Sequence, residues 1–156
     1  MSEALIRAQI KAILEAVTGI GVVHDYKRYA RSIADFRKIM TPTGGTGVNG
    51  WVVSRQKTAS RQATMGPKGQ IERTHIFSIS GIYALDDAAG SETTFQETID
   101  AIFEAFKANG TLNGTAISHQ QIQVEDVDVT PESELGDDLY HTADLTLEVL
   151  ERTAVS

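Results

Sequence analysis

The residues of this chain that could do chemistry are four histidines, a glycine-rich run and several carboxylates, with no cysteine. Histidine can act as a general acid, a general base or a metal ligand. His24, His75, His119 and His141 are each expected on or near a separate strand, and His141 falls on an apolar strand face. No two of them have the i, i+4 spacing that places two metal ligands on one helix face. The pattern predicts core or interface histidines, so we expect no enzyme and no metal.

The glycine-rich run, residues 45–50, matches the dinucleotide-binding pattern G-x-G-x-x-G. That pattern binds phosphate only where a strand precedes it and a helix follows it. Here a loop containing Pro42 precedes the run, and an apolar stretch that begins with Trp51 and resembles a strand follows it. The context predicts a loop, and we expect no cofactor.

A second group consists of carboxylates near the carboxyl end of the chain. They are Glu125, Asp126, Asp128, Glu132, Glu134, Asp137 and Asp138. Carboxylates can bind calcium, but these lack the spacing of an EF-hand loop. The cluster predicts a solvated acidic patch, or a surface that docks against a basic neighbour.

The basic residues of interest cluster on a polar stretch, residues 57–70, and on the strands that flank it. They are Arg55, Lys57, Arg61, Lys68 and Arg73. Three roles remain open: a solvated hairpin tip, a surface that pairs with the acidic half of another subunit, and a contact with phosphate groups. No aromatic residue lies between Trp51 and Phe77 to stack on bases, which disfavours specific binding of single strands.

Charge is unevenly distributed along the chain. Residues 1–75 contain twelve Lys and Arg against five Asp and Glu, whereas residues 76–156 contain two against sixteen. The formal net charge is −7. Oppositely charged surfaces on one domain favour head-to-tail association between copies, because unlike patches attract and like patches repel.

Apolar periodicity predicts the elements that must position these residues. Helices are expected from about Ile6 to Val17, after Ser32, and from a capping box at Thr94 and Glu97 to Asn109. Strands are expected over residues 22–26, 48–56, 71–85, 117–129 and 139–149. The fourth strand changes its apolar parity, which predicts a β-bulge near residues 125–126.

These elements predict a single α+β domain over residues 1–156. We expect a two-layer sandwich with a mostly antiparallel, mixed sheet of about four strands. Two long helices would pack on one face, and there would be a short extra helix. Residues 57–70 would form a long hairpin arm, either extended or mobile. The sequence shows no signal-peptide pattern and no apolar run near the roughly 20 residues that span a bilayer, so no membrane partner is expected.

Three stretches together resemble a known family. They are residues 19–26 (Gly-Ile-Gly-Val-Val-His-Asp-Tyr), 48–55 (Val-Asn-Gly-Trp-Val-Val-Ser-Arg) and 81–87 (Gly-Ile-Tyr-Ala-Leu-Asp-Asp), the last of which leads into the helix at Thr94. Their order resembles the tail terminators, or U-like minor tail proteins, of long-tailed phages and prophages. The resemblance spans most of the chain, from about Ile6 to Val149.

The resemblance implies a structural virion protein that is assembled in the host cytoplasm and resides in the tail. Such a protein forms a ring, usually a homohexamer, that caps the tail tube, stops its polymerisation and offers a surface for head joining. The implied partners are further copies of the chain, the tail tube protein and head–tail connector proteins, with non-specific DNA passing through the lumen. The family supplies no catalytic residues.

Other functions stay open on the sequence alone. Head–tail connectors and tail-completion proteins have a similar size and style. A small-ligand-binding or DNA-binding domain is the remaining alternative, although the sequence shows no motif for a ligand pocket.

Overall fold

The computed structural model describes residues 2–28, 32–43, 47–66, 69–86, 89–131 and 139–154. Over these residues the chain forms three helices and six strands. In chain order they are α1 (Glu3–Glu15), β1 (Val22–His24), α2 (Ile33–Met40), β2 (Asn49–Gln62), β3 (Gln70–Ala84), α3 (Ser91–Lys107), β4 (Ser118–His119), β5 (Gln123–Pro131) and β6 (Leu139–Ala154).

One mixed sheet contains all of these strands, in the order β1-β2-β3-β6-β4, and β5 also pairs with β6. β1 is parallel to β2, whereas the other pairs are antiparallel. β6 is therefore a central strand, with β3 along one side and with β4 and β5 along the other.

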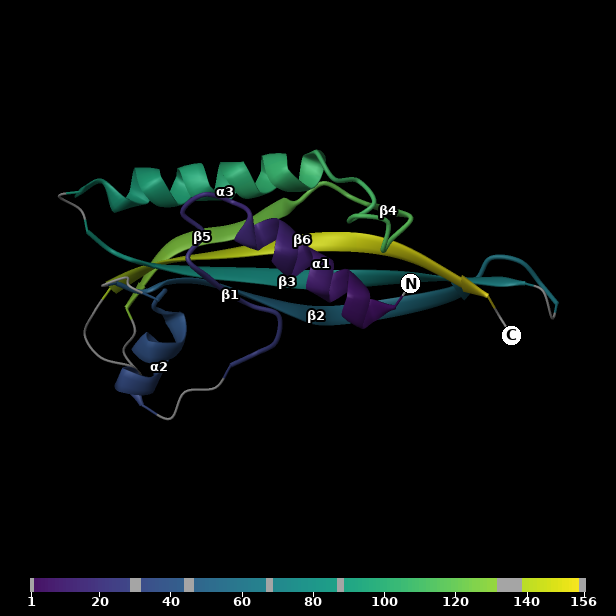
Figure 1. The fold of residues 1–156 in the computed structure, drawn as a ribbon, viewed down its shortest axis with the longest axis horizontal. Coiled ribbons are helices and arrows are strands. Elements are labelled where there is room, and N and C mark those ends of the chain that lie inside the picture. The colour runs from purple at the N-terminus through teal and green to yellow at the C-terminus, as the bar shows by residue number, and fades with distance from the viewer. Residues whose placement is uncertain are drawn as a thin grey trace.

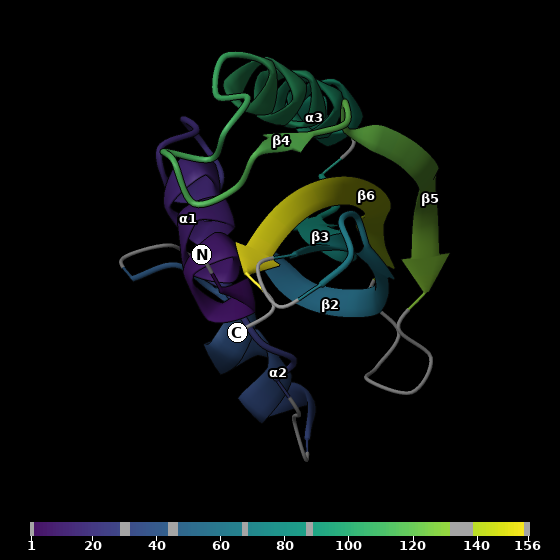
Figure 2. The same cartoon turned by 90° about the vertical axis from the view of Figure 1, so that its right-hand side faces the viewer.

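The sheet is strongly curled and forms a half-barrel, which is visible end-on in Figure 2. Two features of the strands favour this curl. The register shifts between Arg55 and Lys57 in β2, and again between Val124 and Asp126 in β5. Such bulges bend a strand and increase its right-handed twist, and the long strands β2, β3 and β6 accumulate that twist along their length.

The two longer helices, α1 and α3, bury their apolar sides against one face of the sheet (Figure 1). In α1 the buried residues recur at helical spacing, as the sequence predicts. The principal core contains Ile6, Ile10, Ile13 and Leu14 from α1, Phe95, Ile99, Ile102 and Phe106 from α3, and Trp51, Val53, Phe77, Ile79, Leu145, Leu147 and Val149 from the sheet.

The short helix α2 lies on the opposite face, near the end of β3 and the start of β6. It packs a second, smaller cluster there. This cluster consists of Met40, Val48, Ile82 and Tyr140, with Phe36, Ile39, Val52 and Ala84 against them. α2 therefore covers part of the sheet face that α1 and α3 leave open.

The predicted fold class, a sandwich of about four strands packed by two long helices, is wrong. The structure is 42% strand and 29% helix, with six strands in a half-barrel and three helices over the described residues. The prediction failed because strand pairing and curl depend on residues that are far apart in the sequence. The single strand expected over residues 117–129 is two strands, β4 and β5. β2 and β6 also extend beyond their predicted ends, to Gln62 and Ala154, where pairing with β3 maintains them.

The start of α3 also differs from the prediction. The helix begins at Ser91 and its N-cap is Gly90, so Thr94 and Glu97 do not form a capping box. Ser91 Oγ accepts a hydrogen bond from the Asp86 amide at 2.8 Å and also lies 2.8 Å from His141 Nε2. These contacts anchor the helix one turn earlier. By contrast, the predicted bulge near residues 125–126 is confirmed.

Trp51 of β2 packs closely over Gly81 of β3. The two residues are directly opposite in the ladder, and the indole of Trp51 lies over the space that a side chain at Gly81 would occupy. The same indole stacks on Phe95 of α3, with ring centroids 5.7 Å apart. A glycine inside a strand commonly marks such a close approach.

Replacing Gly81 with alanine is expected to destabilise the protein by about 1–3 kcal/mol, as overpacked cores do. An added Cβ would lie 2.6 Å from three carbon atoms of the Trp51 ring. The denaturant midpoint, at unchanged m, measures the effect. Gly110→Ala is the control, because a Cβ there meets no atom within 4 Å. Equal midpoints for the two variants would contradict this packing argument.

Candidate interaction surfaces

The basic residues predicted from the sequence do not form one free surface. Arg61 Nη2 binds Glu72 Oε2 at 2.7 Å, and Arg73 Nη1 lies 3.4 Å from Glu151 Oε1. Lys68 lies outside the described residues. Arg55 and Lys57 are exposed, and neither forms an ion pair within the described part of the chain.

A hollow of about 490 Å³ lies beside Arg55, on the face of the sheet opposite α1 and α3, and two further basic residues line it. Its lining consists of Lys27, Arg28, Val52, Ser54, Arg55, Gln56, Ser78 and Ser80. Cations surrounded by serine hydroxyls are suited to binding carboxylate or phosphate oxygens. Lys27 and Arg28 are not among the predicted basic residues, because they follow β1 and lie about 30 residues before Arg55 in the sequence.

Arg28 is positioned by its neighbours. Its Nη1 donates to His24 Nδ1 at 3.3 Å, and its guanidinium lies 5.4 Å from the centre of the Tyr26 ring. His24 Nε2 lies 3.0 Å from the carbonyl oxygen of Ile39, so that nitrogen carries the proton and Nδ1 accepts. The imidazole thereby links β1 to α2 and orients Arg28 beside the hollow.

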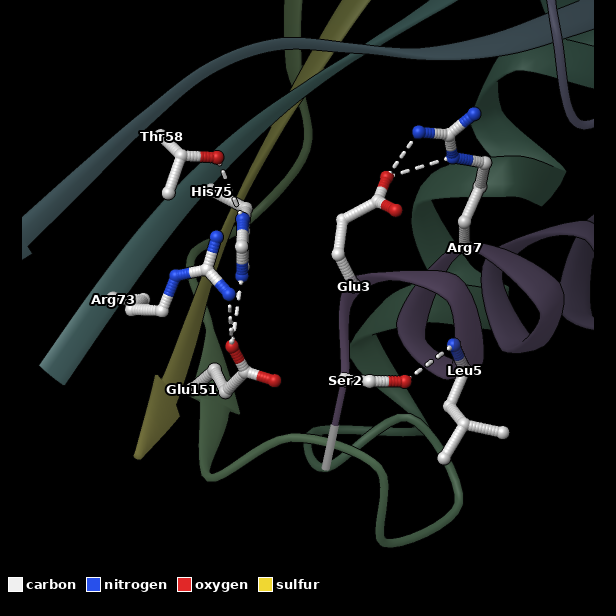
Figure 3. A network of polar contacts seen from close by, with 8 residues as sticks. All are labelled: Ser2, Glu3, Leu5, Arg7, Thr58, Arg73, His75 and Glu151. Atoms are coloured by element: carbon white, nitrogen blue, oxygen red, sulfur yellow. Dashed lines mark hydrogen bonds and ion pairs between the residues drawn. The ribbon is translucent and has the colours of Figure 1, made fainter. Parts of the chain in front are cut away.

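A buried polar cluster lies beyond the core, where β2, β3 and β6 run side by side (Figure 3). Thr58 Oγ1 is 2.8 Å from His75 Nδ1, and His75 Nε2 is 3.1 Å from Glu151 Oε1. His75 and Glu151 are fully buried. The three residues come from three adjacent strands, so their contacts hold this end of the sheet together. Glu151 also pairs with Arg73, which therefore already has a partner for its charge.

Glu151 is not among the predicted site residues, although its position in the sequence carries one signal of its role. The predicted last strand ended at Val149, but Glu151 continues the same alternation on the buried side of β6. An acidic residue at an inward-facing position requires a partner, and His75 and Arg73 provide it.

The members of the predicted acidic cluster that the structure describes lie on β5, beside a further carboxylate, Asp144, on β6. Glu125, Asp126 and Asp128 are exposed, and Asp126 lies directly opposite Asp144 in the ladder. Glu125 accepts a hydrogen bond from Thr146 at 2.8 Å. Like charges opposite one another in a sheet are destabilising, so this surface favours a cationic partner. The remaining predicted residues, Glu132, Glu134, Asp137 and Asp138, lie outside the described residues.

The other sequence features have structural partners. His119 Nε2 lies 2.9 Å from the carbonyl oxygens of Phe106 and Asn109, at the end of α3. In the glycine-rich run, Gly50 packs against Val22 and Met40 so closely that a Cβ would lie within 3 Å of each. Residues 44–46 lie outside the described residues. Within the described ranges, no group of three or more His, Asp or Glu side chains could hold a metal.

Comparisons with known proteins give no family for this chain. No protein-family model matches it, and no curated protein matches it either. Over the described residues, no helix is long and apolar enough to cross a membrane.

Glu72 should make stability depend on pH. Its hydrogen bonds from Arg61 and Arg152 hold the pKa of this carboxyl below its usual value in the folded state. The carboxylate therefore stabilises the fold fully above its unfolded pKa, and this contribution is lost as the pH falls through the folded pKa. The loss in unfolding free energy in Glu72→Gln should be largest at neutral pH and should vanish in strong acid.

Denaturant unfolding at a series of pH values measures this difference. Glu97→Gln is the control, because Glu97 is exposed on α3. A Glu72→Gln penalty that stays constant across the acid range would contradict the ion-pair argument.

Proposed function

We propose that this protein is a structural component of a phage tail, which assembles head-to-tail into a ring and caps the tail tube. One observation carries the association: opposite charges lie at the two sides of one sheet. Lys27, Arg28 and Arg55 lie at the β1–β2 side, and Asp126 and Asp128 lie on β5. A ring requires such a heterologous contact, in which one patch meets a different patch on the next copy.

The tail assignment rests on the resemblance to tail terminators described above. In this proposal the ring, which that family usually builds from six copies, terminates the tube and presents a second face to the head–tail connectors. DNA passes through its lumen on the way out of the head. The protein is made in the host cytoplasm and resides in the virion tail.

A related connector or tail-completion role is the second candidate, and the charged sheet supports it equally well because such proteins also assemble through surfaces. The serine-lined basic hollow also fits a phosphate group. A DNA-binding domain would bind DNA as a monomer, with an affinity that falls steeply as salt increases. Retention of the monomer on a DNA column at moderate salt would favour that candidate.

Self-association should depend on Arg55 and Lys57, the exposed cations of β2. At low salt we expect an oligomer near six copies of 16.9 kDa, about 100 kDa. Arg55→Glu combined with Lys57→Glu should shift it to the monomer, because both side chains are exposed. Arg61 is left unchanged because it pairs with Glu72.

Light scattering at low and high salt measures this mass. Reversal of Lys11 and Lys107, on the helices, is the control with the same change in net charge. If the control dissociates as fully as the Arg55→Glu, Lys57→Glu variant, net charge alone decides the outcome.

Capping should limit the length of tail tubes. When the tube protein of the same phage polymerises in the presence of this protein, we expect shorter tubes with a ring at one end, as seen by electron microscopy. The Arg55→Glu, Lys57→Glu variant is the matched control. Tubes of unchanged length, without terminal rings, would contradict the capping role.

A further inference from the structure

The outer edge of β2 is largely unpaired within the described part of the chain. β1 covers only the three positions Gly50, Trp51 and Val52, whereas β2 continues to Gln62. Beyond the core the side chains of this edge are mostly exposed. An unpaired edge presents a row of backbone N–H and C=O groups, which is a template for another strand.

The hydrogen-bond pattern shows which backbone groups face outward. The Ala63 amide donates to the Gln70 carbonyl at 2.7 Å, so this pair is hydrogen-bonded across the hairpin. Bonded and non-bonded pairs alternate along antiparallel strands. Following the register back, the pairs of Ser60 with Arg73 and of Thr58 with His75 are non-bonded. The N–H and C=O of Ser60 and Thr58 therefore point away from β3, toward the open edge.

β5 forms the second open edge. Its pairing within the described residues is to β6 alone. Val124 lies on the side of the buried Leu145, yet it is 50% exposed, and Val129 is 40% exposed. The Val129 amide donates to the carboxylate of its neighbour Asp128 at 2.7 Å, which indicates that this amide also faces outward. Two exposed valines on an unpaired edge indicate a strand that another chain covers.

The two edges complement each other on one face of the sheet. Ser80 donates to Asp144 at 2.9 Å, which places Asp144 on the face that contains the basic hollow. Asp126 lies directly opposite Asp144 and therefore points to this face as well. If β5 of a second copy extended the sheet at the open edge of β2, Asp126 and Asp128 of that copy would lie over the cations of the hollow.

Strand direction also fits. The pairings between β2 and β3, β3 and β6, and β6 and β5 are all antiparallel, so β2 and β5 of one copy run in opposite directions. Rotation about an axis along the strands preserves direction. In a ring with such an axis, β5 of one copy is antiparallel to β2 of the next, which continues the alternation of the sheet.

We propose that copies of this chain join by strand addition, with β5 of one copy pairing antiparallel to the open edge of β2 in the next. The carboxylates of Asp126 and Asp128 then occupy the hollow lined by Lys27, Arg28 and Arg55. This inference rests on the proposed head-to-tail association and specifies its contact. Placing Asp126 beside Gln56 brings Gln123 next to Ala59.

The absence of cysteine in the chain makes a direct test simple. Ala59→Cys and Gln123→Cys are each introduced alone, and the proteins are treated with a short bis-maleimide. Neither variant alone should give cross-linked dimers, whereas their mixture should. A chain that contains both cysteines should give a ladder of multimers that ends at the native oligomer. Ala108→Cys, paired with Gln123→Cys, is the control for random collision.

A backbone test separates strand pairing from attraction between charges. Thr58→Pro removes an outward N–H that lies opposite Val124 in this register and no backbone hydrogen bond to β3, a position at which sheets tolerate proline. It should abolish the cross-link and lower the native mass to that of the monomer. Thr58→Ala, which loses the same hydroxyl contact with His75 but keeps the N–H, should leave both unchanged. Circular dichroism confirms that each variant is folded.

The outcomes distinguish this contact from the proposed function. An oligomer that gives no β2–β5 cross-link, or that survives Thr58→Pro, overturns strand addition but leaves the ring and its capping role standing. Cross-linking within a single variant means a symmetric contact and also overturns it. A monomer without cross-link at high protein concentration and low salt overturns both strand addition and association in free solution.

Discussion

The contact of Trp51 with Gly81 is the constraint on which the rest of the fold depends. The indole fills the space above the glycine on the neighbouring strand and stacks on Phe95 of α3. Tyr83 and His141 also lie against Phe95, with ring centroids 6.0 and 5.8 Å away. This aromatic group fixes the first half of α3 above the end of the sheet where β2 begins. With both longer helices on one face, the helices leave the edges of β2 and β5 uncovered.

Different interactions stabilise the middle of the sheet and its hairpin end. Apolar burial beneath α1 and α3 stabilises the middle, whereas polar contacts between adjacent strands hold the hairpin end. There, Glu72 binds Arg61 and Arg152, and Glu151 binds His75 and Arg73. These contacts use much of the positive charge of the hairpin. The charge left to meet a partner is consequently smaller than the sequence indicates, and it lies nearer to β1.

Local patterns made part of this structure predictable. The helical faces of α1 and α3 and the alternation in β3 and β6 arise from neighbours along the chain, and so does the parity break in β5. The number of strands and the curl depend on pairings between distant residues, which no local period encodes. The start of α3 depends on Ser91 meeting His141, 50 residues later. Of the predicted surface, Arg55 and Lys57 are exposed, but the partners of Arg61 and Arg73 were not foreseeable from spacing.

The central place of β6 has a consequence for how the chain acquires its structure. β6 is the last strand along the sequence, yet β3, β4 and β5 all pair with it. Long-range pairings of this kind slow folding, because the entropy of loop closure is lost before the contacts form. During synthesis the amino-terminal elements emerge first, and β3 then has β2 on one side and an unpaired edge on the other. The nascent chain is thus most vulnerable to mispairing just before β6 arrives.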